Sequence, residues 1–195
     1  MEKFKGLKGM IILIILVLLV VSYYYHLSNK TRPEKEVVST ETLSPVQEVL
    51  ARNLETNYPQ TPREVVKYFS EITKVAYNEE LTDEDVIDLA NKIQQLYDDE
   101  LIANQTQEEY LKNFKEDISS AHVKKQTVFT YTLSSSIDVE TFSEDGYEWA
   151  RLHCIYGMRQ EGLLYNSDTL FILRKDADGH YKIYGWKLMP REKQS

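Results

Sequence analysis

Hydrophobic and polar positions follow four different patterns along the chain, and each pattern predicts a different kind of structure. Residues 10–21 are apolar without interruption, and residues 28–43 are mostly polar. From residue 44 to about 123 the apolar positions recur with the period of an α-helix, and beyond that point they alternate with a period of two. We therefore expect an α+β fold, with helices first and an antiparallel sheet afterwards.

The apolar run is long enough to cross a bilayer. A helix from Leu7 to Leu27 would measure about 30 Å at ~1.5 Å per residue, the thickness of a hydrocarbon core. Signal-peptide cleavage requires small residues after the run, whereas Tyr23, Tyr24 and Tyr25 suit an interfacial aromatic belt. We therefore expect an uncleaved transmembrane helix, with a cleaved signal peptide or a buried helix as the alternatives. The expected membrane-spanning residues are Met10, Ile11, Ile12, Leu13, Ile14, Ile15, Leu16, Val17, Leu18, Leu19, Val20 and Val21.

The charges beside this run indicate its orientation. Lys3, Lys5 and Lys8 precede it on a very short tail, which favours a cytoplasmic N-terminus. The expected product is a single-pass protein of the cell membrane with its C-terminal domain outside the cytoplasm. Its parts are a cytoplasmic stub and anchor (1–27), a flexible tether (28–43) and an extracytoplasmic α+β domain (44–195).

Four helix starts stand out after the tether. Ser44, Thr61, Thr82 and Thr106 each have Gln, Glu or Asp three residues later, the signature of a capping box, and proline follows the first two. Each start leads into an apolar stripe of helical spacing. The acidic run Asp98-Asp99-Glu100 is interpreted as a solvated charge run at a helix end.

Period-two patterns then predict about four strands, over residues 126–133, 147–159, 165–175 and 180–189. Turn signals at Glu144-Asp145-Gly146, Gln160-Glu161-Gly162 and Asp178-Gly179 predict three consecutive hairpins and therefore an antiparallel meander. The helices are expected to cover one face of this sheet.

The second of these strands has two contrasting faces. One is wholly apolar and is expected in the core: Ala150, Leu152, Cys154, Tyr156 and Met158. The other carries the candidate partner face: Tyr147, Trp149, Arg151 and His153. Aromatic and Arg side chains are enriched at binding hot spots, and Tyr184 and Trp186, expected on one side of the last strand, would extend the face. An ordinary solvent-facing sheet surface and the second wall of a pocket are the alternatives.

Catalytic residues do not converge in the sequence. The candidate general bases are Glu148, His153, Asp168 and His122. Of these, His153 is better explained as a surface residue and Asp168 as a residue that hydrogen-bonds to the adjacent turn. Cys154 is expected to be an inert buried thiol, and a lone cysteine forms no internal disulfide. We therefore predict no enzymatic activity.

Metal, cofactor and nucleic-acid partners are not expected either. The segment "DADGHY" begins like a calcium loop, but Tyr181 stands where that loop requires glycine. The net charge of −8 disfavours a phosphate backbone or anionic lipid headgroups as partners, unless a local basic patch overcomes the repulsion. The expected partners are the lipid bilayer and either an envelope protein or a second copy of the chain.

The order of helices and then long strands, closing in "YKIYGWKLM", resembles the nuclear-transport-factor-2-like domains of the cystatin-like superfamily. The resemblance covers about residues 61–189 and implies a curved sheet wrapped around a long helix as a cone. The whole chain also resembles short, uncharacterised single-pass proteins of Clostridia-type Gram-positive bacteria, through "TPREVVKYFSEI", "LYDDEL" and the closing Gly-Trp-Lys-Leu. That second resemblance implies location and fold and carries no activity.

These observations favour a binding or assembly module of the bacterial cell envelope. Two alternatives remain open. One is a cone-shaped domain with a small-ligand pocket, possibly enzymatic, and the other is an inner-membrane subunit of a conjugative secretion machine.

Overall fold

A computed structural model of the 195-residue chain describes residues 43–190. These residues belong to a compact unit that begins at Leu43. The expected stub and anchor (1–27), and the expected tether up to residue 42, lie outside the described residues. Within residues 43–190, none of the helices has both the length and the apolar character that a membrane crossing requires.

The described part of the chain has five α-helices before the sheet. They are α2 (Pro45–Leu50), α3 (Pro62–Asn78), α4 (Asp83–Gln94), α5 (Asp99–Ala103) and α6 (Gln107–Val123). Ser44, Thr61, Thr82 and Thr106 each form a capping box, accepting a hydrogen bond from the backbone N–H three residues later. The four predicted helix starts are confirmed. Only α5 is additional, and its five residues are too few to show an apolar stripe in the sequence.

Five strands form one open antiparallel sheet. They are β1 (Gln126–Leu133), β2 (Glu140–Glu144), β3 (Tyr147–Gln160), β4 (Leu163–Lys175) and β5 (Tyr181–Leu188). The strand order is β1-β3-β4-β5, and β2 also pairs with β3. Hairpins join β2 to β3, β3 to β4 and β4 to β5, so the three predicted turns are confirmed.

Strand β2 raises the number of strands above the expected four. It pairs with residues 147–151 of β3, and β1 pairs with residues 154–160 along the same edge. The 3₁₀ turn η1 (Ser136–Asp138) lies between β1 and β2. All five residues of β2 are exposed. The strand therefore has no alternation of buried apolar and exposed polar residues from which it could be predicted.

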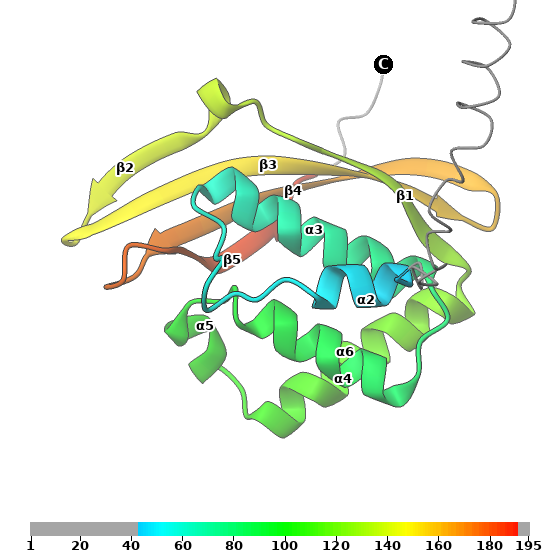
Figure 1. Cartoon of the computed structure of the whole chain (residues 1–195). Coiled ribbons are helices and arrows are strands. Elements are labelled where there is room, and N and C mark those ends of the chain that lie inside the picture. Colours follow the sequence, from blue (N-terminus) through cyan, green and yellow to red (C-terminus); the bar gives the residue numbers. More distant parts are fainter. Residues whose placement is uncertain (1–42, 191–195) are drawn as a thin grey trace, which may run out of the picture. The chain divides into compact units, whose positions relative to one another are not determined.

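The helices cover one face of the sheet (Figure 1). Helix α3 contacts β1, β3 and β5. The five predicted core residues of β3, from Ala150 to Met158, are all buried, which confirms the apolar face. Phe171 and Leu173 of β4 and Ile183 of β5 are also buried in this core.

The opposite face of the sheet, which we call the outer face, points away from the helices. Successive side chains of a strand point to opposite faces, so the residues that alternate with the core positions belong to it, together with their cross-strand neighbours. Its members include Phe129, Phe142, Tyr147, Trp149, Arg151, His153, Ile155, Asp168, Leu170, Ile172, Arg174 and Tyr184. The side chains of Thr130 and Phe129 lie over Gly157, where a Cβ would be 2.6 Å from Thr130 Cγ2 and 2.7 Å from Phe129 Cζ.

A bulge in β5 decides which aromatic side chains reach the outer face. The β4–β5 register shifts so that Tyr184 is an extra residue between Ile183 and Gly185. Tyr184 contacts Trp149 on the outer face, whereas Trp186 packs against aromatic rings on the helix-covered face. The expectation that Tyr184 and Trp186 share one side is therefore wrong, because the extra residue interrupts the period of two.

The connection between α4 and α5 borders the free edge of β5. Ile183 donates its N–H to Leu96 O at 2.8 Å, and Asp98 donates its N–H to Ile183 O at 2.9 Å. Asp98 also caps α5, since its side chain accepts a hydrogen bond from the Glu100 N–H, and it is only 3% exposed. The interpretation of this acidic run as solvated is therefore wrong for Asp98.

Candidate functional site

All four residues of the candidate partner face lie on the outer face, as their alternation along β3 requires. Trp149 is at the centre of an aromatic cluster. Its ring stacks on Phe142 at 6.3 Å and meets Tyr184 edge to face at 5.0 Å and Tyr147 at 6.4 Å between centroids. Its indole N–H donates a hydrogen bond to Glu144 O at 3.1 Å. The side chain is therefore held in one orientation from β2, β3 and β5.

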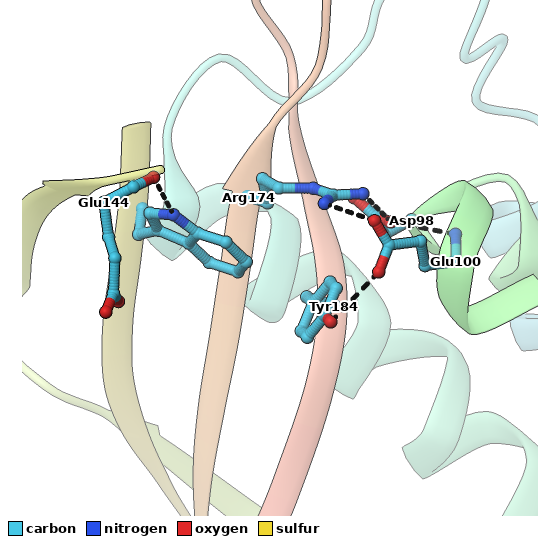
Figure 2. Close-up of polar contacts among 6 residues, drawn as sticks. Asp98, Glu100, Glu144, Arg174 and Tyr184 are labelled. Carbon is cyan, nitrogen blue, oxygen red and sulfur yellow. Dashed lines mark hydrogen bonds and ion pairs between the residues drawn. The ribbon is translucent and has the colours of Figure 1, made fainter. Parts of the chain in front are cut away.

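Arg174 lies beside this cluster and connects it to α5 (Figure 2). Its guanidinium donates to both carboxylate oxygens of Asp98, at 2.9 and 2.6 Å, and to Glu100 at 2.6 Å. The same group lies 4.7 Å from the Tyr147 ring centroid and 5.1 Å from that of Tyr184. The guanidinium is therefore stabilised both by charge-assisted hydrogen bonds to carboxylates and by cation–π attraction to aromatic rings.

The ionisation of this group of residues follows from those contacts. Hydrogen bonds from Arg174 and then Tyr184 lower the pKa of the Glu100 carboxyl below its usual value. Its hydrogen bonds to Asp98 raise the pKa of the Arg174 guanidinium, which keeps it charged at any physiological pH. The Tyr184 hydroxyl donates to Glu100 at 3.1 Å. The cluster is thus fixed by charge as well as by ring packing.

Arg151 and His153 have partners on the same face. Arg151 forms an ion pair with Glu140 and lies over the Phe142 ring at 5.6 Å. His153 Nδ1 lies 2.9 Å from Asp168 Oδ1, so the structure brings together two of the residues considered as general bases. Both side chains are more than a third exposed on an open sheet surface. They lack the apolar walls that a pocket base requires.

The other two candidate bases lie apart from this pair. Glu148 forms an ion pair with Lys175 at 2.7 Å. A ring nitrogen of His122 is 3.2 Å from Ala76 O, at the end of α6. Cys154 is buried, and burial raises the pKa of its thiol, so the thiolate is disfavoured. These residues do not form a catalytic arrangement with His153.

Two open clefts lie on the helical side of the described unit, away from the candidate partner face. One, of about 250 Å³, is lined by Leu50 and residues of α4, and the other, of about 330 Å³, lies beside Tyr58, Tyr97 and Lys182. In the second, burial lowers the pKa of Lys182, whose ammonium donates to Gln95 O at 2.9 Å. Within residues 43–190, no group of three or more His, Cys, Asp or Glu could hold a metal ion.

The space between α3 and the sheet is filled by side chains. Ile72 of α3 belongs to the same buried core as the sheet residues Leu152, Phe171 and Leu173, and all four have almost no exposed surface. Ser70 of α3 is buried, and its hydroxyl lies 2.8 Å from the Tyr156 hydroxyl and 3.5 Å from Cys154 Sγ. The charged groups described above lie instead on the outer face and at its border with α5.

Sequence reasoning identified the four residues on β3 and did not identify Arg174 or Asp98. Arg174 was missed because its partners come from a connection far away in the chain. The alternation of β4 does place it beside Trp149, and Trp149 and Arg174 are direct cross-strand partners. The sheet register, once known, would have been sufficient to find it.

Fold and site together define an α+β domain with helices on one face of an open antiparallel sheet and an aromatic, charge-paired outer face. The chain belongs to the family described as a domain of unknown function, DUF6715, whose sequence model matches residues 1–186. A search among curated proteins found no match.

Proposed function

We propose that this chain is a membrane-anchored assembly module of the bacterial cell envelope, and that its outer face pairs with the outer face of a second copy. In this proposal the apolar run 10–21 is a single-pass anchor with a cytoplasmic N-terminus. The domain from residue 44 onwards lies outside the cytoplasm and has the cone-shaped fold of the nuclear-transport-factor-2-like domains. The protein is neither an enzyme nor a nucleic-acid-binding protein.

The observation that carries the proposal is the aromatic and aliphatic surface of the outer face. Phe129, Phe142, Tyr147 and Ile155 are between 36% and 48% exposed there. The rings around Trp149 are already held by mutual contacts and by Arg174, so their side chains would lose little entropy on binding. Preorganised aromatic and Arg groups are the residues that dominate binding energy at interfaces.

A second copy is the occupant that the charges favour. The chain carries a net charge of −8, so two copies repel each other in most orientations. On the outer face, however, Arg151, His153 and Arg174 each contact an acidic group. These cations offset part of the acidic charge on the face, so a second copy meets less repulsion here than at a surface of acidic side chains alone.

The size of the face also suits a dimer. The twelve paired residues of β3 and β4, at ~3.3 Å each, and four strands about 4.8 Å apart give a surface of roughly 19 Å by 40 Å. That is close to the ~800 Å² per partner of a standard interface.

Two differently tagged copies of the full chain test the proposal. They would be expressed together, extracted from membranes in mild detergent and purified through one tag. Recovery of the second tag supports pairing. Recovery of the first tag alone, or with other envelope proteins and without the second copy, overturns it.

Membrane fractionation tests the anchor separately. The full chain should remain in the membrane pellet after a carbonate wash, because an apolar helix of this length inserts stably. Release of a soluble fragment that begins near Leu27 would show cleavage and overturn this part of the proposal.

A further inference from the structure

The turn between β3 and β4 exposes two neighbouring leucines. Leu163 is 74% exposed and Leu164 is 63% exposed, and they pair with Gln160 and Arg159 across the hairpin. Glu161 and Gly162 form the tight turn, both with positive φ, at 50° and 86°. Hairpin tips are usually polar, so two apolar side chains directly after the turn require an explanation.

The two leucines point to opposite sides of the hairpin. Consecutive residues of a strand alternate between faces, so Leu164 points to the outer face and Leu163 to the opposite side. A protein partner resting on the outer face would cover Leu164 and leave Leu163 in water. A lipid bilayer would surround the hairpin tip instead of covering one side of it. Its apolar boundary would therefore bury both Leu163 and Leu164.

Unpaired cations lie beside the tip. Lys124 and Lys125 are exposed in the connection from α6 to β1, and the first pair of β1 and β3 is Gln126 with Gln160. Arg159, next to that pair, is also exposed. Among the ion pairs of the described residues, none involves these three cations. Glu161 is the acidic side chain of the turn itself.

The tip lies at the end of the domain where the described chain begins. In Figure 1 the β3–β4 turn and the start of α2 are both on the right, and the β4–β5 turn is on the left. Leu43, just before α2, is 57% exposed. Under the proposed anchor, residues 28–42 are all that separates Leu43 from the membrane. The end that carries the tip is therefore held near the membrane surface.

We propose that the β3–β4 hairpin tip inserts Leu163 and Leu164 into the headgroup region of the same bilayer that carries the anchor. Lys124, Lys125 and Arg159 contact the anionic headgroups around it. This contact orients the domain with the long axis of β3 and β4 directed away from the membrane, and it leaves the outer face free at the side. The inference rests on the proposed anchor and does not depend on self-association.

A fluorophore at the tip of the full-length protein tests the contact. Leu163→Cys is labelled with an environment-sensitive dye and reconstituted into vesicles of phosphatidylcholine and phosphatidylglycerol that contain lipids spin-labelled near the headgroup. The matched control is Asp178→Cys in the β4–β5 turn, about 40 Å away along the thirteen residues of β4. The unchanged chain, with buried Cys154 alone, gives the labelling blank.

The emission of the label at residue 163 should shift to the blue and be quenched by the spin-labelled lipid, whereas the label at residue 178 should show neither effect. Equal, water-like emission at both positions in protein that floats with the vesicles would overturn the tip contact and leave the anchor intact. Failure of the protein to float with the vesicles would overturn the anchor and the tip contact together.

A separate comparison of two kinds of vesicle tests the role of Lys124 and Lys125. Replacing Lys124 and Lys125 by Ser should weaken the quenching at residue 163 in vesicles with phosphatidylglycerol and leave it unchanged in pure phosphatidylcholine. Unchanged quenching in both kinds of vesicle would show that Lys124 and Lys125 do not contact the headgroups, and that part of the proposal would be wrong.

Discussion

Arg174 on β4 and Asp98 before α5 form a two-pronged ion pair between residues 76 positions apart in the sequence. The Arg174 side chain is 12% exposed and that of Asp98 is 4% exposed. The pair fastens the α4–α5 connection to the sheet and supports the aromatic cluster around Trp149. The pair depends on tertiary structure, because its two residues come from distant parts of the chain.

Removing the cation of this pair should destabilise the domain strongly. In Arg174→Met the Asp98 carboxylate stays buried without its partner, a change that typically costs about 3–5 kcal/mol. Chemical denaturation of the detergent-solubilised chain, followed by tryptophan fluorescence, measures the loss. The chain's two tryptophans, Trp149 and Trp186, both lie in the domain and therefore report its unfolding.

A second substitution checks the cause of that loss. Asp98→Asn added to Arg174→Met removes the unpaired charge and retains an N-cap for α5, so part of the stability should return. If the double variant were no more stable than Arg174→Met, burial of an unpaired carboxylate would not be the reason.

Leu152 should be among the most sensitive positions of the core. It is 1% exposed on the helix-covered face, so Leu152→Ala should cost about 2–5 kcal/mol through lost contacts and a residual cavity. The matched control is Leu164→Ala at the exposed hairpin tip, which should change the free energy of unfolding by no more than about 0.5 kcal/mol in detergent.

The reactivity of the Cys154 thiol tests the burial of the same helix-covered face. Cys154 has no exposed surface, and burial raises its pKa, so a polar thiol reagent should label the native protein slowly and the denatured protein quickly. Rapid labelling of the native domain would contradict the register of β3.

Stability should decrease at alkaline pH. Burial raises the pKa of Tyr68 to about 12 and, together with the nearby Glu71 carboxylate, raises that of Tyr131 to about 12. The unfolded chain releases these phenolic protons near pH 10, so the stabilisation is complete below pH 10 and is lost as the pH rises towards 12. Denaturation midpoints measured at pH 8 and pH 11 should therefore differ, with the lower midpoint at pH 11.

A phenylalanine variant serves as the control for this pH dependence. Tyr131→Phe keeps the packing and removes one titrating hydroxyl, so the decrease between pH 8 and pH 11 should be smaller. An identical decrease in the variant would mean that Tyr131 does not contribute.

Local signals in the sequence predict much of this fold. The starts of α2, α3, α4 and α6 follow from capping boxes, which depend only on residues three positions apart. The buried face of β3 follows from strict alternation between Ala150 and Met158. Three turns follow from glycine-containing pairs. In each case the residues that form the sequence signal lie within, or a few positions from, the element that they predict.

The features that were missed depend on distant residues or on irregularity. Every residue of strand β2 is exposed. The strand forms because its backbone pairs with the edge of β3. Tyr184 reaches the outer face through a bulge, of which the adjacent Gly185 within the strand is only a weak sequence signal. Asp98 is buried because Arg174 reaches it from another strand. The four candidate residues of β3 share the outer face, as their alternation predicts. Predicting the aromatic and charged cluster around them would have required the sheet register.

The most direct measurement of the central claim is the molar mass of the detergent-purified full chain and two isoleucine variants by light scattering. Ile155→Arg places a charge at the centre of the outer face, and Ile87→Arg places the same charge on α4; the two isoleucines are 40% and 45% exposed. Both variants should keep the stability of the parent to within about 0.5 kcal/mol. We predict a dimer for the parent and for Ile87→Arg and a monomer for Ile155→Arg. A monomeric parent, or an Ile155→Arg variant that stays dimeric, would contradict pairing through the outer face.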